Sequence, residues 1–494
     1  MSMSTTYAVI IAIVMTVIFA LGIYISKRVS SAEDWQVAGR QLGIVLSTGT
    51  YFATLISSVS VIGYTGYYYR LGWGGWFNWT GTIVSCILFS AWYAGRIRRY
   101  GKVTLSDFVE ERFGKLPSGI SAIIVILSCT ILCCFQLIGM GALLRTIFGI
   151  PTTYTIIGVG IFFIIFTVMG GMLSVAYTDT MCAAIMLVGL YIMMFILLGK
   201  VGGFEELHVV VAERKPSMLS PFAGGAMHWG MIFSWAIVNG IGNLGSPQYM
   251  TRFYAATDER TARMSQGVCG LLFFVAYLPL MIIGLAAFVL VPGIASDNDV
   301  VPTVLFQLVP PAVGGLVASA LLCASISTAD SVLLMAGTTA IRDIQQKFFN
   351  PHLSPEKVLR NSRLATLGIG LATIVISLFL SGSVMWIHIN MQNIVASTLA
   401  LPVILGFTVK RINSQGTVAG MVGGAVTAVA WLLMGQPLGL MPVIPGLAVC
   451  AILMFGVSYA TQRPSEQVIE KFFGEGQFEE EDEAIIEKMK LSKA

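Results

Sequence analysis

Charged residues are scarce in this sequence, and their scarcity limits the class of protein. Only 11% of the 494 residues are charged and 25 are acidic, whereas 56% are hydrophobic. With a mean hydropathy of +0.82, the chain has too few polar side chains to cover a water-facing surface. A soluble or disordered protein is therefore excluded. The many glycines and methionines suit helices packed together in a lipid bilayer.

Residues that carry catalytic chemistry are also few. The four histidines lie far apart, without the spacing of a metal site, and the sequence has no phosphate-binding glycine loop of the Walker type. ATP therefore does not drive this protein directly. The net charge of +4 does not indicate a nucleic-acid partner, because the basic residues fall in predicted loops. The sequence predicts neither an enzyme nor a nucleic-acid-binding protein.

Eight cysteines lie inside or at the edge of apolar segments, without the spacing of an extracellular disulfide framework. We expect them to be free thiols. The first apolar run, 7–26, is long enough to cross a bilayer and is expected to remain as a helix rather than to be removed as a signal peptide.

Long apolar runs recur along the chain. A bilayer core about 30 Å thick needs roughly 20 residues of helix. The sequence therefore predicts an all-α integral membrane protein with thirteen transmembrane helices. The predicted spans are 7–26, 43–68, 74–95, 118–146, 152–169, 178–199, 226–248, 267–291, 311–340, 364–381, 384–408, 416–435 and 441–460.

The basic residues predict the orientation of these spans. With the N-terminus outside, 24 of the 29 Lys and Arg fall on the cytoplasmic side and 5 on the other, as the positive-inside rule requires. The C-terminus is then cytoplasmic. We expect a multi-pass protein of the cell membrane, namely a bacterial inner membrane.

Two predicted spans, 43–68 and 226–248, contain poor helix sequence at mid-membrane depth. The first has a run of hydroxyl residues at 54–60, and the second has three glycines and a proline at 239–247. Unpaired backbone groups are costly in hydrocarbon, so a broken helix is tolerated where it lines a cavity; close helix packing by Gly and Ser is the alternative. The breaks are five spans apart, an odd number, which predicts a five-plus-five inverted repeat.

The repeat defines five segments of the chain. They are an extra N-terminal transmembrane helix with a cytoplasmic loop (1–42), the first repeat (43–199), the second repeat (226–408), two C-terminal transmembrane helices (409–460) and an acidic cytoplasmic tail (461–494). Within the tail, 479–490 predicts a solvated amphipathic helix, with a partner-binding helix as the alternative.

Two acids, Asp179 and Asp330, lie in apolar surroundings, where a carboxylate is costly and usually marks an ion or proton path. On a helix, Asp330 shares a face with Ser327 and Ser331. Such a cluster of oxygens suits an alkali cation. The alternatives are a helix cap for Asp179 and a structural hydrogen bond for Asp330.

Five motifs occur in order along the chain. They are VAGRQLG at 37–43, TLSDF at 104–108 with RF at 112–113, MGG at 169–171 followed by TD at 178–179, GSPQ at 245–248 with RF at 252–253, and STADS at 327–331. Together they resemble the sodium:solute symporter family, which includes proline, pantothenate, sugar, sialic acid and iodide carriers. The resemblance covers roughly residues 5–460. It implies that spans two to eleven form the inverted repeat first seen in a leucine carrier.

The resemblance also implies that sodium is the coupling ion and indicates where it binds. The main sodium site would use the carbonyls of Ala53, Ile56 and Ala324 and the hydroxyls of Ser327 and Thr328. A second site, present in some members, would use Asp179, Ser327, Asp330 and Ser331. This chain has two carboxylates in that set, whereas the partners in the family are hydroxyl groups. The second carboxylate could bind the cation more tightly or could be protonated, and the sequence leaves both alternatives open.

The same resemblance implies a substrate site near the two breaks. Its candidates are Ser57, Ser60, Cys134, Gln136, Asn239, Asn243 and Pro247. Proline carriers have Trp and Tyr where this chain has Asn239 and Asn243, which argues against proline. Sialic acid carriers have an arginine on the fourth span that pairs with the substrate carboxylate, whereas this chain has no basic residue between Lys115 and Arg145, which argues against sialic acid. The neutral donors and acceptors suit a small monocarboxylate or a pantothenate-like compound. A neutral sugar, polyol or urea-like solute, or an amino acid such as proline, is the alternative.

The sequence thus predicts a sodium-coupled symporter that works by alternating access. A channel would require polar rings along a continuous pore, and a membrane sensor would require a signalling domain, for which the 34-residue tail is too short. A proton-coupled carrier remains an alternative. The sequence does not determine the oligomeric state, and a monomer is one option.

Overall fold

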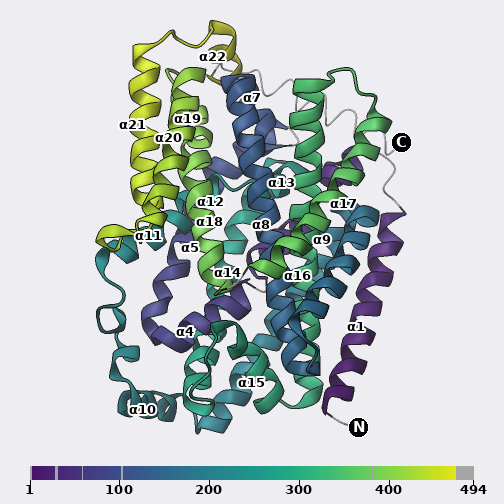
Figure 1. The fold of residues 1–494 in the computed structure, drawn as a ribbon, viewed down its shortest axis with the longest axis vertical. Coiled ribbons are helices and arrows are strands. Elements are labelled where there is room, and N and C mark those ends of the chain that lie inside the picture. The colour runs from purple at the N-terminus through teal and green to yellow at the C-terminus, as the bar shows by residue number, and fades with distance from the viewer. Residues whose placement is uncertain (1–2, 28–31, 58, 102–103, 381, 474–494) are drawn as a thin grey trace.

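The computed structural model describes residues 3–27, 32–57, 59–101, 104–380 and 382–473. Within these ranges every regular element is a helix, and one isolated bridge pairs Leu42 with Ala256. The helices form a bundle along one long axis, with the start of α1 at one end and α22 at the other (Figure 1). The helix predicted at 479–490 lies outside the described residues.

Nine helices in the described part of the chain are long and apolar enough to cross a bilayer, or ten if a bent pair, Ile44–Leu55 and Ser60–Phe89, is one span. The nine are α1 (Met3–Ser26), α8 (Lys115–Phe148), the second part of α9 (Gly171–Val201), α14 (Glu259–Leu290), α16 with its continuation η8 (Pro311–Phe349), α17 (Pro355–Phe379), α18 to α19 (Val384–Thr408), α20 (Ser414–Leu433) and α21 (Val443–Ala460). The all-α class is confirmed, whereas the number thirteen stays a prediction.

The remaining helices are shorter. They are α2 (Ala32–Val37), α3 (Ile44–Leu55), α4 (Thr65–Leu71), α5 (Phe77–Phe89), α6 (Gly95–Tyr100), α7 (Leu105–Phe113), the first part of α9 (Thr152–Val168), α10 (Phe204–Arg214), α11 (Trp229–Asn239), α12 (Ile241–Leu244), α13 (Pro247–Ala255), α15 (Val300–Leu308) and α22 (Glu466–Phe473). Several of the predicted spans are built from two or three of these pieces.

Gly171 divides α9 into two helices. A continuous helix of its 50 residues would be about 75 Å long, far more than a bilayer core. Gly171 has φ +70° and ψ 175°, a conformation that favours glycine. A Cβ atom here would lie 2.7 Å from Cδ1 of Trp35. The predicted spans 152–169 and 178–199 therefore meet at a residue that only glycine fits.

Both predicted breaks are present. Helix α3 ends at Leu55, helical structure resumes with η2 (Val59–Tyr64), and the two parts are bent by 50°. In the other span, α11, α12 and α13 follow one another as short pieces. Pro247 lacks a backbone N–H and therefore suits the first turn of α13. How the two halves are related by symmetry stays a prediction.

An ion cluster joins α7 to η8, the continuation of α16 at 340–349. The ammonium nitrogen of Lys347 lies 2.9 Å from Asp107, 2.7 Å from Glu110 and 2.8 Å from Asp343. Burial alone would raise the pKa of Asp107, but Lys347 and Arg342 hold it below its usual value. This Lys347 cluster therefore fixes the end of α16 against α7.

Candidate functional site

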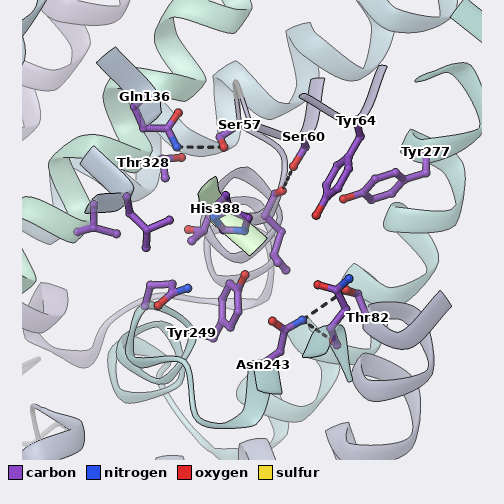
Figure 2. Close-up of a pocket in the computed structure, with 16 residues that line it drawn as sticks. Ser57, Ser60, Tyr64, Thr82, Gln136, Asn243, Tyr249, Tyr277, Thr328 and His388 are labelled. Carbon is purple, nitrogen blue, oxygen red and sulfur yellow. Dashed lines mark hydrogen bonds between the residues drawn. The ribbon is translucent and has the colours of Figure 1, made fainter. Parts of the chain in front are cut away.

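A polar cavity with about 560 Å³ of space not filled by atoms lies between the two breaks (Figure 2). Five of the seven predicted substrate residues line it, namely Ser57, Ser60, Gln136, Asn239 and Asn243. Among the described residues that line it, none is Asp, Glu, Lys or Arg. The cavity thus offers neutral donors and acceptors to a solute.

Hydrogen bonds hold the amides of this cavity in place. The Gln136 amide nitrogen donates to the Ser57 hydroxyl at 3.1 Å, which ties α8 to the first break. The Asn243 amide nitrogen donates to the Asn239 carbonyl at 2.5 Å, and its oxygen accepts from Gln392 at 3.2 Å. Four elements therefore position the polar groups before any solute binds.

The lining residues that were not predicted as substrate contacts include three tyrosines and a histidine: Tyr64, Tyr249, Tyr277 and His388. The ring centroids of Tyr64 and Tyr277 are 5.8 Å apart, and Figure 2 shows the two rings side by side at one wall of the cavity. Tyr249 could have been predicted from the sequence, because it lies two residues after Pro247, which was a candidate substrate residue. His388 is one of the four scattered histidines, and its buried Nδ1 has no hydrogen-bond partner in the described structure.

The two other predicted substrate residues do not line this cavity. The Cys134 thiol lies 3.6 Å from the Thr373 carbonyl and contacts α17. Pro247 begins α13, so it positions the next residues, Gln248 and Tyr249, which do line the cavity.

Three of the five residues predicted for the main sodium site lie together where α3 ends beside α16. The Thr328 hydroxyl lies 3.4 Å from the Ala53 carbonyl and 2.9 Å from that of Ala324. Ile56 caps the end of α3 and is 1% exposed, and a helix end leaves carbonyls without intrahelical partners. The buried Ser327 hydroxyl has no partner in the described structure. Thr328 also lines the central cavity.

The two buried acids each keep one oxygen available. Thr50 donates to Asp179 and Thr167 to Asp330, both at 2.5 Å. The second oxygen of each carboxylate is buried without a partner among the described residues. The Ser331 hydroxyl donates to the Ser327 carbonyl at 3.1 Å. Unpaired carboxylate oxygens in a membrane interior are costly, so this arrangement suits a cation or a proton.

Comparison with known proteins identifies the family of this chain. The model of the sodium:solute symporter family matches residues 35–424. The chain belongs to this family. The resemblance inferred from the sequence motifs is thus confirmed. Sodium, the coupling ion of the family, is therefore the coupling ion of this protein. The role is transport of a small molecule across the cell membrane by a multi-pass protein, not catalysis.

Relatives of this symporter cover nearly its whole length. It is 26% identical to the high-affinity proline transporter PutP of Bacillus subtilis (strain 168), over 92% of this chain and 98% of that protein. It is 24% identical to a sodium/proline symporter of Staphylococcus aureus (strain JH9), over 92% of this chain and 93% of that protein. A Na+-coupled sialic acid symporter, solved in a substrate-bound outward-open state, has the same fold, with a TM-score of 0.83, 19% identity and coverage of 93% and 99%.

Proposed function

We propose that this symporter couples inward sodium movement to the import of a small solute with a single carboxylate. The observation that carries the proposal is a shared residue: Thr328 belongs both to the predicted sodium site and to the wall of the central cavity. A sodium ion at Thr328 would pull the ends of α3 and α16 together and so shape the cavity. Substrate and sodium then stabilise the same state of the protein.

Sodium supplies enough energy for accumulation. Moving one charge through a potential of about 100 mV yields about 2.3 kcal/mol, and a tenfold sodium gradient adds about 1.4 kcal/mol. One sodium ion per cycle therefore supports an accumulation ratio on the order of several hundredfold.

The substrate class follows from the cavity. Because none of the described lining residues is Lys or Arg, an anionic group would rest on backbone N–H groups at a helix N-terminus and beside sodium. This suits a monocarboxylate, a pantothenate-like compound or a zwitterion, and disfavours a phosphate or dianion. Among zwitterions, proline is the first to test because two relatives are named for it. A neutral sugar, polyol or urea-like solute is the second candidate, favoured by the uncharged lining.

The decisive experiment is a thermal-shift screen of the purified protein in sodium and in choline buffer. A substrate binds the native state and raises the melting temperature by mass action. We expect proline or a small monocarboxylate to raise it in sodium and to have little effect in choline. Stabilisation by neutral sugars alone would contradict the proposed class, and equal stabilisation in both buffers would contradict sodium coupling.

We also propose that Asp179 and Asp330 form a second cation site with Ser327 and Ser331. Each carboxylate has an unpaired buried oxygen, which a cation would satisfy. The variants Asp179→Asn and Asp330→Asn should each lower the sodium-to-substrate ratio in proteoliposomes. An unchanged ratio would remove this site from the mechanism. Uptake driven by a pH gradient without sodium would instead assign the acids to proton coupling.

For the arrangement in the membrane we propose thirteen spans, with 43–199 and 226–408 as inverted repeats. The N-terminus would be outside and the Lys347 cluster on the cytoplasmic side. The supporting observations are the biased distribution of basic residues and the position of α22 at the opposite end of the bundle from the start of α1 (Figure 1).

A further inference from the structure

A second, smaller polar cavity lies between the acid pair and the Lys347 cluster. It is bordered by α2, the start of α7, α9, α13 and α16, and α16 also borders the central cavity. Its polar lining residues are Gln36, Thr104, Thr251, Arg252, Ser331 and Thr338. Its space suffices for one or two particles the size of water. No carboxylate lines this cavity in the described part of the chain.

Arg252 is the only guanidinium in this lining, as far as the structure describes the chain, and it is 2% exposed. One of its terminal nitrogens donates to the Gln248 carbonyl at 3.0 Å and to the Thr251 hydroxyl at 3.2 Å. Its Nε and its other terminal nitrogen have no partner in the described structure. Asp179 interacts with it electrostatically but accepts a hydrogen bond from Thr50 instead. Three N–H donors of a buried cation are therefore unsatisfied.

Two further donors in the lining are unsatisfied. The Gln36 oxygen accepts from Arg342 at 3.2 Å, and because a guanidinium only donates, this contact fixes which end of the amide is nitrogen. That nitrogen is buried without a partner in the part of the chain described, and so is the Thr338 hydroxyl. The cavity wall thus carries an excess of hydrogen-bond donors around a positive charge.

We propose that this cavity binds one monatomic anion of the size of chloride, held by Arg252, Gln36 and Thr338. Unsatisfied buried donors are costly, and an anion satisfies several of them at once. The space, about that of one or two water molecules, suits a monatomic anion. This inference rests on the proposed function for its sodium dependence. Sodium in the proposed second site would offset the negative charge of Asp179 and Asp330, and so strengthen the attraction of Arg252 for the anion.

The test measures binding of radioactive chloride to the purified full-length protein at saturating sodium. We expect saturable binding that bromide displaces and gluconate does not. Thr338→Val removes one donor without changing shape and should weaken chloride binding about tenfold. We expect the wild type to melt at a higher temperature in sodium chloride than in sodium gluconate. Gln36→Glu adds a carboxylate to the cavity lining, so it should abolish chloride binding and remove this difference.

The matched control is Thr339→Val. Thr339 is the neighbouring residue on α16 and also has a buried hydroxyl without a partner in the described structure, but it does not line this cavity. We expect its chloride affinity to equal that of the wild type. Absence of saturable binding would show that the cavity holds water, and equal weakening in both threonine variants would also overturn the proposal. A different result would separate this proposal from the proposed function. If chloride bound equally well with and without sodium, and uptake did not depend on sodium, the anion site would be supported and the proposed symport contradicted.

Discussion

Replacing Thr328 by Val should raise the sodium concentration for half-maximal uptake by at least about tenfold. Valine keeps the shape of the side chain and removes the hydroxyl that lies between the carbonyls of Ala53 and Ala324. A hydrogen-bonding group contributes about 1.5–3 kcal/mol when its partner is charged, and we expect a similar contribution from a hydroxyl that binds sodium. Losing it would lower the sodium affinity on the order of 10- to 100-fold. The measurement is substrate uptake into proteoliposomes over a range of sodium concentrations.

The control for this variant is Thr366→Val on α17. Thr366 is also buried and donates to the carbonyl four residues before it, at 2.8 Å, as Thr328 does, but it does not line the central cavity. Its sodium dependence should equal that of the wild type. An unchanged sodium dependence in Thr328→Val, or an equal change in both variants, would contradict the assignment of Thr328 as a ligand.

Replacing Lys347 by Met should strongly destabilise the folded protein. The ammonium group lies within 2.9 Å of three carboxylates, and the Asp343 side chain is fully buried. Removing one partner of a buried ion cluster typically costs about 3–5 kcal/mol. The melting temperature in detergent should therefore fall by several degrees.

A second substitution distinguishes electrostatic repulsion from a loss of packing. Adding Asp343→Asn to Lys347→Met removes one of the uncompensated charges and should recover part of the lost stability. Lys357→Met, at an exposed lysine on α17, should leave the melting temperature unchanged. Failure of Asp343→Asn to recover any stability would show that the lysine acts through its aliphatic chain instead.

The breaks in the helices could be predicted because their causes are local. Glycine, proline and runs of hydroxyl residues weaken a helix wherever they stand, and those at 54–60 and 239–247 do so here. Gly171 was different. Its flanks are equally apolar, so the sequence indicated two spans without showing that a single left-handed residue separates them within α9. The count of spans is similarly hard to fix, because short pieces such as α11 and α12 do not reach bilayer length.

The candidate site could be predicted only in part. Neutral polar residues such as Gln136 and Asn239 are conspicuous in an apolar sequence, because burying them requires a partner or a ligand. The tyrosines of the same cavity are not conspicuous in the sequence, because an aromatic ring in a membrane helix can equally pack against neighbouring side chains. Tyr64 and Tyr277 were therefore found from the structure alone. Arg252 was known only as part of a motif, and its unsatisfied donors depend on contacts among separate helices.

All eight cysteines were expected to be free, and each is a buried thiol in the structure. Oxidants and glutathione react with exposed thiolates and spare thiols that water does not reach. In the state that the structure describes, oxidants in the surrounding water therefore meet no exposed cysteine thiol of this symporter.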